Sequence, residues 1–254
     1  MKTNISIIIV ISVLSLFLGS CRARFYTPNR NPIPFFKAKG DVFIDASTNV
    51  FNKYDLTLGY ALTNALGAYV GYAGASQKGD FSDTFKYSKY KYSGDMLNLG
   101  FGYFLNQNIA EHFRFEVFGD YGMGTYKNSV VGDKNQYFNG KYQRIGIMPN
   151  IGYSSENFSM AYSVRLSQLS FSNASFSDSA VWSDDINRLS SKDYYTMLEQ
   201  CIQFRMGFEH IKFQAQIGAY SALNATEEKN AVPQFNASFI VGVAINTNIL
   251  GNGD

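Results

Sequence analysis

The chain has 254 residues, of which 16% are aromatic and only 17% are charged, and its formal net charge is +2. No basic stripe accompanies that small charge, so the composition gives no support for a nucleic-acid partner. After the N-terminal region, no apolar run is long enough to form a spanning helix. A chain rich in aromatic residues but of modest mean hydropathy is typical of a membrane β-barrel, in which only alternate residues face lipid.

The N-terminal residues predict export and lipidation. A polar start with one lysine precedes an apolar run over residues 5–18, which is followed by Gly19, Ser20 and Cys21. This is the architecture of a signal peptide, and the apolar run is too short for a comfortable transmembrane helix. Small residues before a cysteine fit lipoprotein processing. We therefore expect a signal peptide over residues 1–20, and covalent diacylglyceryl and N-acyl (palmitate-type) lipid on Cys21; the alternative is an ordinary secretory signal with an incidental cysteine.

The next segment, residues 21–39, has no strand-like alternation and contains Pro28, Pro32 and Pro34. Proline-rich segments are extended and semi-rigid. We expect a lipidated extended tether that lies beneath the first strand, with its lipid in the periplasmic leaflet.

From residue 41 onward, apolar and polar residues alternate with the period of a β-strand. One face of a predicted strand contains Arg114, Glu116 and Asp120, which is too charged for the interior of a soluble sandwich. Most of these segments have nine or more residues, the length that a tilted strand needs to cross a bilayer. The ten predicted strands are 41–49, 54–62, 66–76, 95–105, 112–124, 141–153, 158–171, 194–208, 211–222 and 234–246.

The connections between these strands alternate in length. They are short after the second, fourth, sixth and eighth strands, and long after the third, fifth, seventh and ninth, with 77–94 and 172–193 the longest. Barrels of the outer membrane have tight periplasmic turns and extended external loops. We predict an all-β fold, a closed antiparallel transmembrane β-barrel of about ten strands over residues 40–248, with a short periplasmic tail over 249–254.

The alternative fold is a soluble sandwich or lipocalin-like barrel with its apolar face inside. That fold would place a set of glycines on the outer surface, where small side chains gain nothing. In a membrane barrel the same glycines face a crowded lumen, so we favour the membrane barrel. The glycines are Gly59, Gly71, Gly100, Gly102, Gly146 and Gly242.

Strand phase directs nine charged side chains into the predicted lumen: Asp45, Asp55, Arg114, Glu116, Asp120, Arg144, Arg165, Glu199 and Arg205. Unpaired charges in a confined lumen are costly, so we expect the arginines to pair with the carboxylates across the barrel. The two interpretations are a selective pore lining and a structural plug. We favour the plug because barrels near eight strands are filled by side chains. Cys201 shares this face, has no disulfide partner once Cys21 is lipidated, and is interpreted as an unreactive filler.

The long connections contain aromatic residues that suit contact with a protein or a glycan. The candidates are Phe85, Tyr87, Tyr90, Tyr92, Phe176 and Trp182. An equally good interpretation is that their segments extend the strands above the membrane. The triplet Asp178-Ser179-Ala180 matches a short O-glycosylation acceptor pattern known in Bacteroidota, which makes Ser179 a candidate acceptor.

No constellation predicts catalysis, a metal site or a cofactor. The two histidines, His112 and His210, fall at predicted periplasmic turns, whereas the acids of the long loops lie on the opposite side of the membrane. A carboxylate must lie within hydrogen-bond reach of an imidazole to orient it as a general base. We therefore predict that the protein is not an enzyme and keep an omptin-like or lipid A deacylase-like enzyme as the third hypothesis.

Three motifs resemble a known family. They are Tyr26, Pro28 and Asn29 with an offset Asn31 and Pro32 in the tether, Gly-Tyr-Ala-Leu-Thr-Asn-Ala-Leu-Gly over 59–67, and Phe-Arg-Phe-Glu-Val-Phe-Gly-Asp-Tyr-Gly over 113–122. In these motifs the chain resembles the uncharacterised outer-membrane β-barrel lipoproteins of the Bacteroidota. The resemblance implies location and architecture, and brings no activity with it.

The leading functional hypothesis is a non-enzymatic, lipid-anchored barrel with a structural or accessory-binding role beside a larger outer-membrane protein complex. The alternative is a narrow passive channel for small solutes or ions. The expected surroundings are outer-membrane lipid of a Gram-negative bacterium, with the long loops extracellular and no nucleic-acid partner.

Overall fold

The structure is a computed structural model of the chain. It describes residues 25, 26, 28–49, 53–83, 86–105, 111–131, 133–177, 187, 189, 192–225 and 236–248. The predictions for the signal peptide, Cys21, Phe85, Ser179, Trp182 and the tail over 249–254 lie outside these residues.

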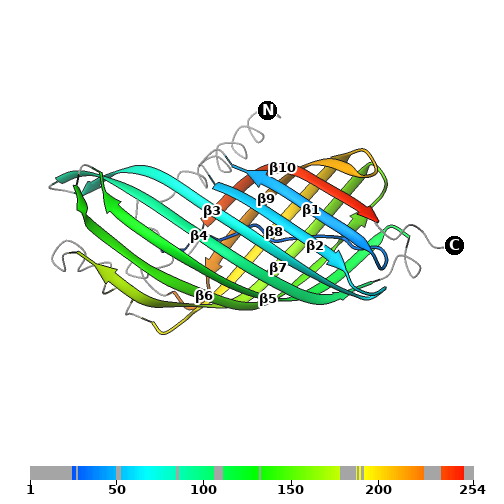
Figure 1. Ribbon diagram of the computed structural model, residues 1–254, viewed down its shortest axis with the longest axis horizontal. Coiled ribbons are helices and arrows are strands. Elements are labelled where there is room, and N and C mark those ends of the chain that lie inside the picture. Colours follow the sequence, from blue (N-terminus) through cyan, green and yellow to red (C-terminus); the bar gives the residue numbers. More distant parts are fainter. Residues whose placement is uncertain are drawn as a thin grey trace, which may run out of the picture.

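Ten strands form one closed antiparallel barrel, in which each strand pairs with its neighbours in sequence and β1 pairs with β10 (Figure 1). The prediction of an all-β, closed ten-strand barrel is confirmed. The strands are β1 Asp41–Thr48, β2 Lys53–Ala61, β3 Leu66–Asp83, β4 Lys86–Phe104, β5 Phe113–Val130, β6 Asp133–Ser154, β7 Phe158–Phe176, β8 Tyr195–Gly207, β9 Ile211–Ala222 and β10 Asn236–Asn248.

The two ends of the barrel differ. We call the end at which β2–β3, β4–β5, β6–β7 and β8–β9 connect the turn end; β1 begins and β10 ends there. We call the opposite end the loop end. In Figure 1 the turn end is on the right.

The predicted long loops after the third and fifth strands are wrong. Strands β3 and β4 stay paired from Leu66 opposite Tyr103 to Asp83 opposite Lys86, so most of the segment 77–94 is strand. Strands β5 and β6 likewise stay paired up to Val130 opposite Asp133. Pairing continues because each strand satisfies the backbone N–H and C=O groups of the other, which an open loop would leave to water. Of the two interpretations of 77–94, strand extension is the one that the backbone adopts.

The outward faces of the strands are apolar, and the inward faces are polar. In β2, Leu56 and Leu58 are exposed on the outside, whereas Asp55 and Thr57 between them are buried inside. The same alternation places Leu97, Leu99, Phe101 and Tyr103 of β4 outside, as predicted. A closed barrel that is apolar outside and charged inside satisfies all its backbone groups between strands and presents hydrocarbon to its surroundings, which defines a transmembrane barrel. Among the described residues, no helix has the length and apolar character needed to cross a membrane.

The predicted position of the tether beneath the barrel is wrong for the part that the structure describes. We call residues 25–39 the N-terminal segment. Its described residues up to Phe36 lie inside the lumen, where Phe25, Ile33 and Phe36 are each at most 1% exposed, and Lys39 is exposed at the turn end. The segment runs along the barrel rather than across its opening. Phe36 packs against Phe104 and Phe118 near the turn end, and Phe25 packs against Tyr126 and Phe138 near the loop end.

Candidate functional site

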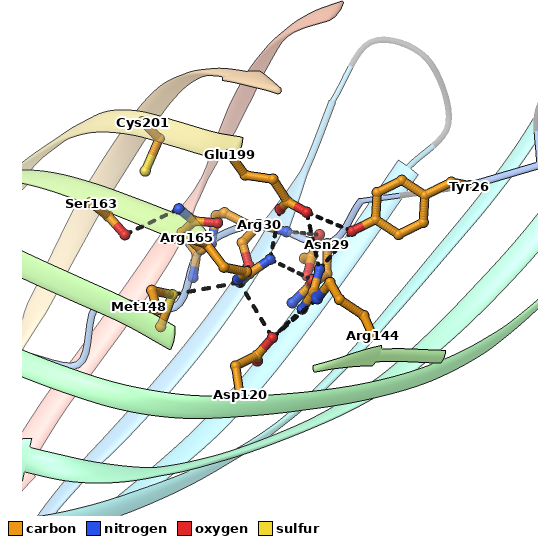
Figure 2. Close-up of polar contacts among 12 residues, drawn as sticks. Tyr26, Asn29, Arg30, Asp120, Arg144, Met148, Ser163, Arg165, Glu199 and Cys201 are labelled. Atoms are coloured by element: carbon orange, nitrogen blue, oxygen red, sulfur yellow. Dashed lines mark hydrogen bonds and ion pairs between the residues drawn. The ribbon is translucent and has the colours of Figure 1, made fainter. Parts of the chain in front are cut away.

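The centre of the lumen contains a cluster of two carboxylates and two arginines from four successive strands (Figure 2). Arg144 Nη2 of β6 lies 2.6 Å from Asp120 Oδ1 of β5, and Arg165 Nη1 of β7 lies 2.8 Å from Glu199 Oε2 of β8. The cross-pairs Arg144–Glu199 and Arg165–Asp120 are both 3.5 Å long. Each charge therefore has two partners of opposite sign, which compensates for its removal from water. We call these four residues the central cluster.

The N-terminal segment completes the central cluster. The Tyr26 hydroxyl donates to Glu199 Oε1 at 2.7 Å and accepts a hydrogen bond from Arg144 Nη1 at 2.7 Å. Asn29 Oδ1 accepts a hydrogen bond from Arg165 Nη1 at 3.1 Å. Figure 2 shows Tyr26 and Asn29 among the side chains of the barrel wall. Two residues of the segment thus form hydrogen bonds with charged side chains of the central cluster.

A second contact joins the segment to β1 and β2. Arg30 forms an ion pair with Asp45, and the backbone N–H of Arg30 donates to Asp55 Oδ2 at 3.2 Å. Asp45 also accepts a hydrogen bond from Gln214 Nε2 at 2.7 Å, and Arg205 lies 3.9 Å away. Arg30 therefore brings a positive charge to two buried carboxylates of the wall.

The wall also binds the backbone of the segment. Five consecutive carbonyl oxygens, those of residues 30–34, each accept a hydrogen bond from a side chain on a different strand. Prolines at positions 32 and 34 have no N–H group, so the lumen needs no acceptor there. The donors and their distances are Arg165 of β7 at 3.3 Å, Gln216 of β9 at 3.4 Å, Asn150 of β6 at 3.3 Å, Arg205 of β8 at 2.7 Å and Asn246 of β10 at 3.0 Å.

Two phenylalanines fix the segment near the turn end. Phe35 has a left-handed backbone conformation, with φ of 53°, which directs it and Phe36 to different parts of the wall. The Phe36 ring lies against Gly59 and Gly67, and the Phe35 ring lies against Gly152. A Cβ atom at Gly67 would lie 2.6 Å from the Phe36 ring, closer than such atoms pack. These glycines therefore make room for the segment.

This contact predicts that a loss of stability caused at Gly67 can be partly reversed by a second substitution at Phe36. Gly67→Ala is expected to destabilise the folded barrel by about 1–3 kcal/mol, because the added methyl overpacks against Phe36. Adding Phe36→Ala should recover part of the loss, which unfolding of the single and double variants in detergent would measure. Gly119→Ala is the matched control, since its Cβ would meet only a carbonyl oxygen at 3.6 Å. Equal losses in the presence and absence of Phe36 would contradict the contact.

The structure buries all nine charged residues that the strand phase directed inward. Seven of them make the contacts described in the preceding paragraphs. An eighth, Glu116, accepts a hydrogen bond from the backbone N–H of Phe36 at 2.9 Å. Arg114 bonds differently, donating to the backbone carbonyls of Glu111 and Phe113 at 2.8 and 2.9 Å. The luminal network therefore includes hydrogen bonds from Arg114 to backbone carbonyls at the turn end as well as ion pairs across the barrel.

Sequence reasoning missed the residues of the segment itself, namely Tyr26, Asn29 and Arg30. The count of inward charges gives no signal for them. The described strands bury five carboxylates and five cations, because Lys212 of β9 is buried beside the four arginines, so the number of charges does not single out Arg30. What requires Arg30 is its position, since it pairs with Asp45 and its backbone N–H donates to Asp55.

Several candidates for loop recognition lie elsewhere than expected. Tyr92 is 6% exposed and belongs to the aromatic cluster around Phe25, so it is not available to an external partner. Phe176 is the last residue of β7, is 41% exposed, and stacks on Phe138. Tyr87 and Tyr90 belong to β4, and their side chains lie outside the described residues.

Cys201 lies in the lumen and is buried. Its Sγ accepts a hydrogen bond from Gln216 Nε2 at 2.6 Å. It packs beside Ile33 and Phe35 of the segment. Its surroundings are those of a packing residue.

The two histidines lie at the turn end, where the side chains of His112 and His210 are 47% and 61% exposed. His112 lies 3.8 Å from Glu111, and His210 lies 4.0 Å from Glu209. Within the described part of the chain, no three His, Cys, Asp or Glu side chains converge in a way that could hold a metal ion.

The fold and its interior thus define the class: a transmembrane β-barrel whose lumen is occupied by its own N-terminal segment. No protein-family model matches the chain, and no curated protein matches its sequence. Solved barrels resemble it in structure. The translocator domain of autotransporter NalP from Neisseria meningitidis has 11% identity and a TM-score of 0.41, covering 81% of this chain and 86% of that one.

Two further solved structures that resemble the chain are not autotransporter domains. A KdgM porin has 10% identity and a TM-score of 0.36, covering 81% of this chain and 98% of that one. LpxR from Salmonella typhimurium has 8% identity and a TM-score of 0.35, covering 81% and 99%. Likenesses this distant transfer no activity to this chain.

Proposed function

We propose that this protein is a non-enzymatic, lipid-anchored outer-membrane barrel that is closed by its own N-terminal segment and has a structural or accessory-binding role in a larger outer-membrane complex. The observation that supports this most directly is the bonding of five consecutive segment carbonyls to five strands. A lumen used in this way has its polar groups committed to the chain itself. Binding to a partner would then take place on the outer surface of the barrel.

One cavity beside the N-terminal segment is too small for a solute. A cavity of about 30 Å³ lies beside residues 28–31, between the segment and strands β8, β9 and β10. That volume holds one or two water molecules and no solute. The alternative function, a narrow passive channel, requires the segment to leave the lumen.

The outer membrane is proposed from the two ends of the barrel. Connections at the turn end have three to eight residues, whereas 18 and 13 residues separate β7 from β8 and β9 from β10 at the loop end. The other loop-end connections are short, but β3 with β4 and β5 with β6 continue there as long paired strands. Outer-membrane barrels place short turns in the periplasm and long loops outside. We infer the same orientation here, with the loop end extracellular.

The proposed membership of the Bacteroidota barrel lipoproteins is supported by a contact between the 59–67 motif and the N-terminal segment. The glycines that begin and end the 59–67 motif both lie against Phe36 of the N-terminal segment. The glycines of this motif therefore have a physical role, which is to make room for the segment. Lipid on Cys21 is part of the same proposal.

An accessory role is tested by purification of the tagged full-length protein from native outer membranes in mild detergent, followed by mass spectrometry. We expect a larger outer-membrane protein to be recovered in fixed proportion. An unrelated tagged barrel of similar abundance is the control. Recovery of the protein alone would contradict the accessory role and leave the closed barrel standing.

The proposed lack of enzymatic activity rests on the separation of His112 and His210 from the acids of the loop end. Both histidines lie at the turn end, where the neighbouring carboxylates are solvent-exposed glutamates. Peptidase and lipid A deacylation assays on the purified barrel are expected to show no turnover. Asp184 and Asp185 are two acids of the connection between β7 and β8 at the loop end. Turnover that disappears on Asp184→Asn or Asp185→Asn would overturn this part of the proposal.

A further inference from the structure

The direction of the N-terminal segment determines on which side of the membrane the chain begins. At one end of the segment, the backbone N–H of Gly40 donates to Ala61 O, where β2 ends at the turn end. At the other end, Phe25 lies in the cluster with Tyr126, Phe138 and Tyr195, all near the loop end. Going from residue 39 back to residue 25, the chain therefore travels through the lumen from the turn end toward the loop end.

Phe25 lies beyond the apolar band of the barrel exterior. On β5 the outward apolar residues end at Met123, and the outward residues on either side of Tyr126 are Thr125 and Lys127. On β6 the outward positions between the aromatic Tyr137 and Ile145 are polar, namely Asn139, Lys141 and Gln143. Because Phe25 packs against Tyr126 of β5 and Phe138 of β6, it lies at the level of the polar outward residues.

We propose that the segment crosses the membrane inside the barrel, so that the mature N-terminus emerges at the cell surface and lipid on Cys21 anchors the protein from the external side. This inference rests on the orientation and lipidation in the proposed function. Cys21 is four residues from Phe25 and reaches at most about 15 Å from it, at 3.8 Å per residue. The apolar band of such barrels is about 25 Å tall.

The chain from Phe25 to Cys21 is shorter than the apolar band is tall. A lipid in the periplasmic leaflet is therefore incompatible with a segment that occupies the lumen. For the lipid to lie in the periplasmic leaflet, the segment would have to withdraw and break the bonds of Tyr26, Asn29 and Arg30. With the segment in place, only the external side is within reach. The expected periplasmic position of the lipid is replaced by an external one.

The test uses single cysteines in the full-length protein with Cys201→Ala. Arg24→Cys is expected to react with a membrane-impermeant maleimide on intact cells. Leu223→Cys, 57% exposed at the loop end, is the positive control, and Asn157→Cys, exposed in the turn between β6 and β7, should react only after the membrane is permeabilised. Labelling of Arg24→Cys only after permeabilisation, with both controls behaving as expected, would overturn the proposal.

A second measurement tests the position of the segment inside the lumen, independently of orientation and lipidation. A photoreactive phenylalanine analogue at position 25 is expected to crosslink to the peptides of β5 and β6 that contain Tyr126 and Phe138, from which Phe25 is separated by ring-centroid distances of 5.4 and 5.7 Å. Absence of these crosslinks in a folded barrel would overturn the threaded segment. Reversed labelling of the two control cysteines would instead overturn the proposed orientation, and with it the external N-terminus. Radiolabelled palmitate incorporation that Cys21→Ala does not abolish would overturn the lipid part alone.

Discussion

Deletion of residues 25–36 is expected to convert a closed barrel into a conducting one. The deletion removes Tyr26, Asn29 and Arg30 from the charged centre of the lumen and Phe36 from the turn end. The arginines and amides that donate to the segment carbonyls would then be hydrated. Because the strands remain paired around the whole ring, the deletion should leave the barrel wall in place.

Planar-bilayer recording of the purified proteins measures this effect. The full-length protein is expected to give no steady open current, and the deletion variant is expected to give steady currents. Deletion of residues 226–235, in the connection between β9 and β10, is the control of similar length and should leave the bilayer silent. Steady currents from the full-length protein would favour the passive channel, and silence of both deletions would mean that wall side chains close the lumen without the segment.

Arg144→Ala is expected to produce the largest loss of stability among single substitutions in the lumen. Arg144 lies 2.6 Å from Asp120, 3.5 Å from Glu199 and 2.7 Å from the Tyr26 hydroxyl, and its side chain is fully buried. Its removal leaves two buried carboxylates with Arg165 as their shared counter-charge. Breaking a buried ion pair by removing one partner costs about 3–5 kcal/mol, because the remaining charge is left uncompensated.

Urea unfolding in detergent, followed by heat-modifiable migration on gels, measures this loss. Lys141→Ala, three residues earlier in β6 but exposed on the outside, is the matched control and should change the free energy of unfolding by less than about 0.5 kcal/mol. An equal, small effect of both substitutions would show that the central cluster contributes little to stability.

The barrel wall was predictable from local pattern alone. In β2 and β4 the outward positions alternate strictly with inward ones, and this period of two also defines the strand boundaries to within one or two residues at the turn end. The same phase identified Asp120, Arg144 and Arg165 as luminal. The extension of β3 and β4 past residue 76 was one of two equal interpretations of that segment, because polar strands above a membrane have the composition of loops.

The position of the N-terminal segment could not be predicted from pattern. A proline-rich stretch without alternation has the same composition whether it is a solvated tether or a buried thread. Its place depends on contacts between residues more than a hundred positions apart, such as Tyr26 with Glu199 and Asn31 with Ser163. No local rule links these positions.

By itself, the sequence therefore determined the membrane barrel, its strand number and the charged character of its lumen, since each depends on the alternation of side chains along single strands. Only the tertiary structure decided what occupies that lumen. The physical reason is that closure of the ring brings five carboxylates, four arginines and a set of amide donors to face one another across a narrow space. The extended segment of residues 25–39 is the part of the chain whose carbonyls, Arg30 and aromatic rings complement that space.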